Sequence, residues 1–258
     1  MEDYSKLERY LTTFLKNEVE KNNFKNVVLG LSGGLDSAVV AVLLQKVFGK
    51  NLTAIMMPNA TSNQDSLNHA KKLCKKFHID FTIEPIDKLV DAYFKDKNPN
   101  PLQMGNFSAR MRMSILYDIS AKLNALVIGT SNKSELLLGY GTIHGDLACA
   151  INPIGDIYKS DLFGFASHLG VIEEIINKAP SADLWEGQSD EEELGFSYEK
   201  IDEVLRDFID QKLSYEELLE KGYDKNLINM ITKRFYQNQF KRQLPIIAKL
   251  DKAKIKSA

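Results

Sequence analysis

The first residues of the chain repeat apolar and polar positions with the spacing of a helix. Five apolar residues fall on one side of a helix drawn over about residues 4–22: Leu7, Leu11, Phe14, Leu15 and Val19. The pattern therefore predicts an amphipathic helix that buries this stripe. The stripe can pack on its own subunit or against a second copy of the chain, and the sequence leaves both open.

From residue 26 to residue 129, short β-branched and apolar runs alternate with segments of helical periodicity. The runs predict strands at 26–31, 52–57, 79–84 and 125–129. The segments between them predict helices at 36–48, 64–77, 87–93 and 107–123. This alternation is typical of α/β proteins, so we expect a doubly wound, mostly parallel sheet flanked by helices.

Three segments, one within this alternation and two after it, lack a strand or helix pattern, and we expect them to be loops. They are the Pro- and Gly-containing stretch 95–106, the glycine-rich stretch 139–156 and the acidic stretch 182–195. Helical patterns return at about 159–169 and 171–177, and the C-terminal third has no strand candidate. We therefore predict one domain over residues 1–247 with a helical C-terminal extension, followed by a disordered basic tail at 248–258.

Composition narrows the class of protein without indicating its chemistry. The 258 residues include 33 Lys and Arg, 35 Asp and Glu, and two cysteines, with a formal net charge of −2. Near-neutral charge argues against a general nucleic-acid binder, and two cysteines are too few for a disulfide framework or a four-thiolate zinc site. We see no secretory signal and no apolar run of membrane-spanning length, so we expect a soluble, cytoplasmic protein without a membrane partner.

The segment with the clearest chemical meaning is Ser-Gly-Gly-Leu-Asp-Ser, residues 32–37, between a predicted strand and a predicted helix. Two adjacent glycines let the backbone approach a ligand closely, and the N–H groups at the start of a helix bind anions. Generic turn chemistry offers a simpler explanation, in which Asp36 or Ser37 only caps the helix. No Walker A or Rossmann glycine motif occurs elsewhere in the chain.

The hexapeptide resembles the SGGxDS pyrophosphate loop of the ATP pyrophosphatase superfamily, whose members cleave ATP between its α and β phosphates. Four more motifs follow in order: GNFSARMRM (105–113), GTSNKSELLLGYGT (129–142), NPIGDIYKSDL (152–162) and PSADLWEGQSDEEELG (180–195). Together the five motifs, over residues 4–247, resemble ammonia-dependent NAD synthetase. The resemblance implies an adenine nucleotide α-hydrolase-like fold and the conversion of deamido-NAD, ATP and ammonia into NAD, AMP and pyrophosphate through an acyl-adenylate.

The resemblance also implies roles for individual residues. Asp36 and Glu135 match the family's Mg²⁺ ligands, and Lys159 matches a catalytic lysine that approaches the ATP phosphates. Twelve positions match or neighbour the family's ATP-binding residues: Gly30, Leu31, Ser32, Gly33, Gly34, Leu35, Asp36, Ser37, Met57, Thr130, Lys159 and Ser181. Without the motifs, Asp36 reads as a helix-dipole partner, Lys159 as a solvated lysine and Met57 as a core residue.

The dinucleotide half of the site matches the family less well. Arg110, Asp146 and Lys241 match its deamido-NAD residues, and Asp146 is also a candidate to handle the proton of the attacking ammonium. The family commonly has Lys, Asp and His at three positions where this chain has Ile143, Ala150 and Phe240. The resemblance also implies a homodimer and, because no glutaminase segment is visible, free ammonia as the nitrogen donor.

Two other functions compete with this one. Another ATP pyrophosphatase, of the tRNA-modifying or GMP synthetase type, would share the loop, but Cys74 and Cys149 form no CxxC pair and the net charge is not basic. A non-catalytic adenine-nucleotide binding module would not need Asp36, Glu135 and Lys159 together.

Overall fold

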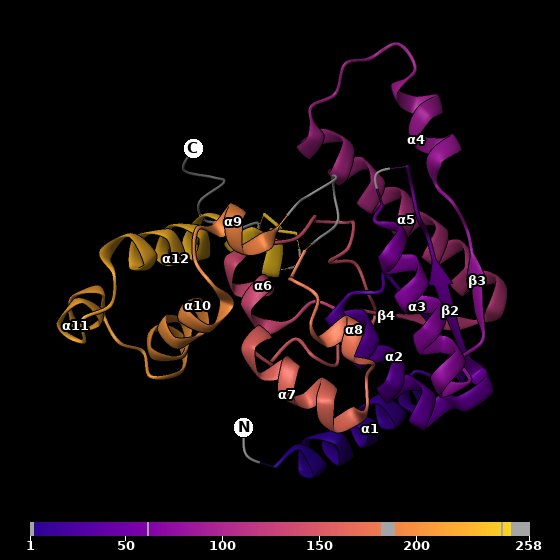
Figure 1. Ribbon diagram of the computed structural model, residues 1–258, viewed down its shortest axis with the longest axis horizontal. Coiled ribbons are helices and arrows are strands. Elements are labelled where there is room, and N and C mark those ends of the chain that lie inside the picture. Colours follow the sequence, from indigo (N-terminus) through magenta and orange to yellow (C-terminus); the bar gives the residue numbers. More distant parts are fainter. Residues whose placement is uncertain (1–2, 61, 182–188, 244, 249–258) are drawn as a thin grey trace, which may run out of the picture.

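Four parallel strands form a single sheet in the order β3-β2-β1-β4 in the computed structural model, which describes residues 3–60, 62–181, 189–243 and 245–248 (Figure 1). The strands are β1 (Asn26–Gly30), β2 (Leu52–Met56), β3 (Phe81–Ile83) and β4 (Ala125–Ile128). In the central strand, Val27 pairs with Leu52 on one side and Leu126 on the other. The continuous apolar runs predicted as strands are typical of a parallel sheet that is covered on both faces.

Twelve α-helices occur in the described part of the chain: α1 (Tyr4–Lys21), α2 (Leu35–Phe48), α3 (Gln64–Phe77), α4 (Asp87–Phe94), α5 (Pro101–Leu123), α6 (Lys133–Leu138), α7 (Lys159–Leu169), α8 (Glu173–Ile176), α9 (Asp190–Leu194), α10 (Tyr198–Leu205), α11 (Tyr215–Glu220) and α12 (Lys225–Gln237). Three short turns of 3-10 or π geometry join them: η1 (Gly49–Asn51), η2 (Arg206–Asp210) and η3 (Gln239–Arg242).

The helices cover the two faces of the sheet in separate groups. Apolar residues of α1, α2, α3, α7 and α8 form one core cluster with β1 and β2. Those of α4 and α5 pack on the opposite face, against Ile55 and Val28. The doubly wound parallel sheet expected from the sequence is therefore confirmed. The helix after β1 and the helix before β4 lie on opposite faces, which opens a crevice beyond the carboxyl ends of these two strands.

The apolar stripe of α1 packs inside its own subunit. Leu11, Leu15 and Val19 are buried in the core cluster that contains α2 and α7. Tyr10, next to the stripe, is exposed. The structure thus favours the intramolecular partner for this helix, one of the two that the sequence left open.

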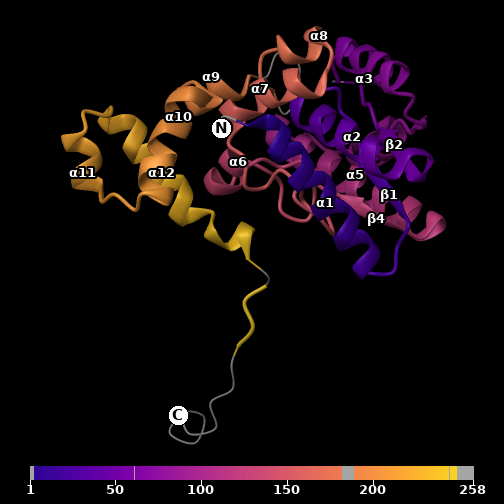
Figure 2. The same cartoon turned by 90° about the horizontal axis from the view of Figure 1, so that it is seen from below.

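Helices α10, α11 and α12 form a second, smaller cluster at one side of the sheet layers (Figures 1 and 2). Tyr198, Ile201 and Leu205 of α10 are buried in it. The helical C-terminal extension predicted from the sequence is therefore present, and no strand occurs in its described residues.

The predicted loop at 95–106 is wrong in its second half, because α5 already begins at Pro101. The Asn100 side chain accepts a hydrogen bond from the Gln103 N–H at 2.8 Å, and Pro101 occupies the first turn. An asparagine cap followed by proline is a helix-start signal. The loop prediction rests on Pro99, Pro101 and Gly105 as loop formers.

Two short helices also differ from the expectation. Helix α6 had not been predicted, although Asn132 and Glu135 form a capping box that marks its start. Helix α9 lies inside the acidic stretch 182–195 that was expected to be a loop, with the Ser189 side chain as its cap. Residues 182–188 of that stretch lie outside the described residues, as do residues 249–258 of the predicted tail.

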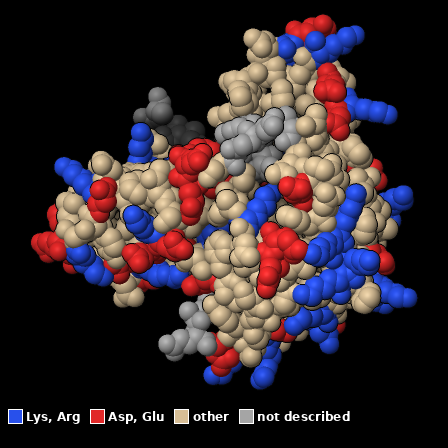
Figure 3. All heavy atoms as spheres, in the orientation of Figure 1, with Lys and Arg blue, Asp and Glu red and all other residues tan. Residues whose placement is uncertain are grey.

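Charge is distributed unevenly over the surface. Lys and Arg side chains gather over α3 and the helices beside it, whereas both signs are mixed over the C-terminal helices (Figure 3). Helix α3 alone contributes Lys71, Lys72, Lys75 and Lys76. A net charge of −2 therefore conceals a locally basic face. In the described residues, no helix has both the length and the apolar character required to cross a membrane.

Candidate active site

The Ser-Gly-Gly-Leu-Asp-Ser segment forms a tight turn that carries the chain from β1 into α2. Gly33 has a φ of +85°, and a Cβ at this position would lie 2.0 Å from the Ser66 carbonyl oxygen of α3. Only glycine tolerates both the left-handed conformation and this close approach. The turn is thus packed against α3 rather than free to move away from it.

Hydroxyl groups stabilise the same turn from inside. The Ser32 and Ser37 hydroxyl oxygens lie 3.0 Å apart, and Ser32 Oγ accepts the Gly34 N–H at 3.2 Å. Ser37 Oγ donates to the Gly34 carbonyl at 3.0 Å, and Ser37 is buried. Ser37 therefore stabilises the turn from its buried side, whereas Ser32 lies on its exposed side.

A cleft opens beyond the carboxyl ends of β1 and β4, with a cavity volume of about 280 Å³. Most of the predicted ATP and metal residues line it: Gly30, Leu31, Ser32, Gly34, Leu35, Asp36, Met57, Thr130, Glu135, Lys159 and Ser181. They come from β1, from the segments that follow β1, β2 and β4, from α6 and α7, and from the segment after α8. The cleft lies where ligands bind in open α/β sheets, at the point where the strand order reverses.

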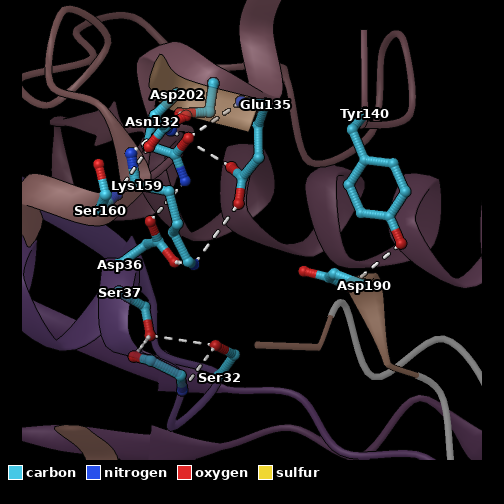
Figure 4. Close-up of polar contacts among 12 residues, drawn as sticks. Ser32, Asp36, Ser37, Asn132, Glu135, Tyr140, Lys159, Ser160, Asp190 and Asp202 are labelled. Atoms are coloured by element: carbon cyan, nitrogen blue, oxygen red, sulfur yellow. Dashed lines mark hydrogen bonds and ion pairs between the residues drawn. The ribbon is translucent and has the colours of Figure 1, made fainter. Parts of the chain in front are cut away.

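Lys159 lies between two carboxylates in this cleft (Figure 4). Its ammonium group forms an ion pair with Asp36 and lies 3.7 Å from Glu135 Oε1. The Lys159 side chain is only 5% exposed. We call Asp36, Glu135 and Lys159 the cleft triad.

Burial sets the electrostatics of the cleft triad. Burial and the charge of Asp36 raise the pKa of Glu135 well above its usual value. For Lys159, burial acts to lower the pKa, but the charges of Asp36 and Glu135 outweigh it and the pKa of the lysine is raised. One ammonium thus faces two carboxylates, and burying the charge of the second carboxylate is energetically unfavourable.

Asn132 connects the two carboxylates of the triad, a role that our sequence analysis missed. Its side-chain Nδ2 donates to Asp36 Oδ1 at 2.8 Å, and its Oδ1 accepts the Glu135 N–H at 2.9 Å. Glu135 Oε2 in turn accepts the Asn132 N–H at 3.2 Å. Asn132 is fully buried. The Asn-x-x-Glu spacing of a capping box was the available sequence signal.

The predicted dinucleotide residues do not meet in the cleft. Asp146 lines it, and its Oδ1 accepts the Thr142 N–H at 2.6 Å. Arg110 does not line it, and its Nη1 donates to the Asn106 carbonyl at 3.4 Å. Lys241 donates to the carbonyls of Gly139 and Gly141, at 2.8 and 2.9 Å.

Arg112, two residues after Arg110 on α5, lies in the cleft instead. Its Nε donates to the Met57 carbonyl at 2.9 Å. Ile143, Ala150 and Phe240, where the chain departs from the family pattern, do not line this cleft either. The cleft therefore gathers the ATP and metal candidates more completely than the dinucleotide candidates.

Two further polar groups reach the cleft without having been predicted. Lys178 Nζ donates to Ser66 Oγ at 2.6 Å, and both residues line the cleft. Tyr140 donates its hydroxyl toward Asp190 and Glu193, at 3.1 and 2.9 Å. Lys178 lies three residues before Ser181, so the motif that contains Ser181 was the signal. Tyr140 pairs with α9 across 50 residues of chain, which no local pattern indicates.

Comparison with known proteins agrees with this arrangement. The NAD synthase family model matches residues 7–245. An NH3-dependent NAD(+) synthetase of Wolinella succinogenes is 53% identical over 248 residues, covering 95% of this chain and 96% of the relative.

Solved structures give the same result. The NH3-dependent NAD synthetase of Campylobacter jejuni has a TM-score of 0.84 and 42% identity, covering 96% of this chain and 100% of that one. The NMN synthetase of Francisella tularensis has a TM-score of 0.86 and 30% identity, covering 96% and 99%. The match spans almost the whole of both kinds of relative. The chain belongs to the NAD synthase family.

Proposed function

We propose that this protein catalyses the ATP-dependent amidation of deamido-NAD by ammonia, giving NAD, AMP and pyrophosphate. The observation that carries the proposal is the cleft triad beside the Ser-Gly-Gly-Leu-Asp-Ser turn, in a chain of the NAD synthase family. A phosphate-binding turn with a buried lysine suits cleavage of ATP next to its α phosphorus. A nucleotide-binding module without chemistry would not need to bury these three charged groups together.

In the first step, a nicotinate carboxylate oxygen attacks the α phosphorus of ATP, and the bond to the bridging oxygen of pyrophosphate breaks. Backbone N–H groups of the turn at residues 32–36 are suited to hold the departing pyrophosphate. The Lys159 ammonium is suited to stabilise the charge that develops on it. Thr130 and Ser181 line the same cleft and offer hydroxyl groups to ATP, and Met57 offers an apolar wall to the adenine.

In the second step, ammonia attacks the carbonyl carbon of the acyl-adenylate, the bond to the AMP oxygen breaks, and one proton must leave the nitrogen. Asp146 lines the cleft and is our candidate to accept that proton. Arg110 and Lys241 are our candidates for dinucleotide recognition beyond the cleft. Lys241 would have to exchange its carbonyl partners for a substrate phosphate or carboxylate.

We also propose that Asp36 and Glu135 hold Mg²⁺. No group of three metal-ligating side chains exists among the described residues, so the protein offers two carboxylates and leaves the other positions to phosphate oxygens and water. Burial and the charge of Asp36 raise the pKa of Glu135 despite Lys159, so a further cation beside the two carboxylates would favour the charged form of Glu135. When bound, Mg²⁺ would neutralise negative charge on the pyrophosphate.

The decisive experiment is an assay with ATP, Mg²⁺, deamido-NAD and ammonium chloride. We expect NAD, AMP and pyrophosphate in equal amounts, and loss of product formation after chelation of Mg²⁺ with EDTA. A parallel reaction contains nicotinate mononucleotide, because one structural relative is an NMN synthetase. Formation of ADP, or amidation of the mononucleotide in preference to deamido-NAD, would contradict the proposed function.

A homodimer is the assembly that we propose for this chain. Large apolar side chains remain exposed along α4 and α5, among them Leu89, Tyr93 and Leu102 at 47%, 49% and 57%. Such a face is typical of an interaction surface. Light scattering coupled to gel filtration tests the proposal, and a mass near 29.2 kDa at micromolar concentration would contradict it.

A further inference from the structure

The first turn of α7, which begins with Lys159, is capped by residues from two other helices. Its own N-cap residue, Tyr158, makes no side-chain capping bond. The Lys159 N–H instead donates to Ser134 Oγ of α6 at 2.9 Å, and the Ser160 N–H donates to Asp202 Oδ2 of α10 at 2.8 Å. N–H groups in a first helical turn have no partner within the helix, so these external acceptors satisfy them.

A single carboxylate, that of Asp202, touches the beginnings of both α6 and α7. While Oδ2 accepts from Ser160, Oδ1 accepts the Ser134 hydroxyl at 2.5 Å. Because Ser134 donates its only hydroxyl proton to Asp202, its oxygen is free to accept the Lys159 N–H. Asp202 is 1% exposed and Ser134 is fully buried. Figure 4 shows Asp202 and Ser160 on the side of Lys159 away from Tyr140 and Asp190.

The two helix starts that Asp202 joins carry two members of the cleft triad. Lys159 is the first residue of α7, and Glu135 directly follows Ser134 in the first turn of α6. Their side chains approach to 3.7 Å in the cleft. The distance between the ammonium and the carboxylate therefore depends on how these two helix starts are placed relative to each other.

We propose that Asp202 is a positioning residue that sets the geometry of Lys159 and Glu135 and thereby the binding of ATP. The proposal rests on the proposed function, in which these two side chains face the ATP phosphates. Asp202 acts through the backbone of α7 and the Ser134 hydroxyl and does not touch the substrate. It also connects the C-terminal helices to the cleft, which gives them a part in nucleotide binding.

A merely structural role explains these contacts less well. Burial raises the pKa of Asp202, although Ser134 and Ser160 act in the opposite direction. An apolar residue of similar volume is frequently the more stable way to join two buried helices. A buried carboxylate that caps α7 and also accepts the Ser134 hydroxyl of α6 is specific in its geometry, and this favours a role in placing the residues at these two helix starts.

The test is the Asp202→Asn substitution, whose amide can accept through one oxygen only and presents N–H groups to at least one donor. We expect KM for ATP to rise and kcat/KM to fall by about 10–100-fold, the usual loss when a supporting contact of a binding group is removed. The matched control is Asp207→Asn. Asp207 accepts from Lys221 and Tyr223, both at 2.6 Å and both in the turn between α11 and α12.

Binding of ATP with MgCl2, measured by titration calorimetry without deamido-NAD, separates this proposal from the proposed function. We expect Asp202→Asn to weaken ATP binding and Asp207→Asn to leave it unchanged, with circular dichroism confirming that both are folded. If the wild type binds ATP but forms no NAD, the proposed function fails while the role of Asp202 in ATP binding is still measured. Equal ATP affinity in the two variants would overturn our inference about Asp202.

A second variant keeps the inference testable if Asp202→Asn does not fold. Ser134→Ala removes the acceptor of the Lys159 N–H and is expected to weaken ATP binding by itself. If both single variants fold, combining them should weaken binding little more than either does, because both act through one connected set of hydrogen bonds. Unchanged ATP affinity in Ser134→Ala, or losses that multiply in the double variant, would contradict the proposal.

Discussion

Lysine meets glutamate both in the cleft of this protein and on its surface. In the cleft triad, the side chains of Lys159, Glu135 and Asp36 are 5%, 17% and 16% exposed. On the surface, Glu8 of α1 lies 2.6 Å from Lys46 Nζ of α2 and 3.0 Å from His168 Nε2 of α7. We call Glu8, Lys46 and His168 the surface cluster.

The pKa values of the two glutamates shift in opposite directions although each faces a lysine. The hydrogen bond from Lys46 lowers the pKa of Glu8, whereas burial raises the pKa of Glu135. Burial, not the presence of a partner lysine, therefore decides whether the charged form is favoured. The surface cluster joins α1 to α2 and α7 with little loss of hydration of its charged groups. The cleft triad holds charge where it is unfavourable, which is common where a site is prepared for a charged ligand.

Replacement of Lys159 should have the largest effect. We expect Lys159→Met to lower kcat for NAD formation about 10²–10³-fold, because it removes a cation aimed at developing charge. It should also reduce the free energy of unfolding by roughly 3–5 kcal/mol, since Asp36 and Glu135 would share the cleft without a cation. Turnover and urea unfolding measure the two effects.

The control for this variant is Lys46→Met in the surface cluster. It should leave turnover unchanged and alter the free energy of unfolding by less than about 1 kcal/mol. Comparable losses of turnover and stability in the two variants would mean that burial does not distinguish the cleft triad from the surface cluster.

Neutralisation of Glu135 should separate activity from stability. Glu135→Gln keeps the capping box, because glutamine can also reach the Asn132 N–H. We expect activity to fall about 10–100-fold and more Mg²⁺ to be needed for half-maximal rate. The free energy of unfolding near pH 7 should not fall, because an unfavourable buried charge is removed.

The chain offers a matched control for this variant in Glu217, which occupies the same position of the capping box of α11 and is exposed. Glu217→Gln should leave activity and Mg²⁺ dependence unchanged. A clear loss of stability in Glu135→Gln would contradict the view that the buried charge of Glu135 destabilises the folded protein.

Lys178 tests whether a cleft lysine matters without a carboxylate partner. Among the described residues, its ammonium has the Ser66 hydroxyl within hydrogen-bond distance and no carboxylate within 4.0 Å. We expect Lys178→Met to raise KM for ATP by about 10-fold, equivalent to roughly one charge-assisted hydrogen bond. An unchanged KM in steady-state assays would show that a lysine does not contribute to ATP binding merely because it lies in the cleft.

The smallest effect should come from the surface cluster itself. Glu8→Gln should lower the free energy of unfolding at pH 7 by less than about 1 kcal/mol and leave activity unchanged. Because the pKa of Glu8 is lowered on folding, its contribution is present above about pH 4.5 and is lost as the pH falls through its folded value. Urea unfolding of the wild type and Glu8→Gln should therefore converge in acid. A difference that persists at low pH would contradict the ion-pair interpretation.

Local sequence was sufficient to predict the elements whose start and end signals lie within a few residues of their bounds. The helix over 64–77 was predicted at its observed bounds, because its periodicity and its Asn63 cap are adjacent in the chain. The turn at residues 32–37, between a strand and a helix, was also predicted from local sequence. The error at Pro101 arose from a local signal that supports two interpretations, since asparagine and proline begin both loops and helices.

Tertiary structure alone decided the contacts between distant residues. The sequence determined an α/β sheet and a glycine-containing turn after its first strand, and the family resemblance indicated Asp36, Glu135 and Lys159 as candidates. It did not determine that one buried ammonium would serve two carboxylates, that Asn132 would join them, or that Asp202 would cap the helix carrying Lys159. Apart from the local contact of Asn132 with Glu135, those contacts span from 24 to 123 positions of chain, for Glu135 with Lys159 and for Asp36 with Lys159. Periodicity and local motifs report on neighbours a few residues away, whereas the pKa values and geometry of this cleft follow from burial, which only the folded sheet and its helices create.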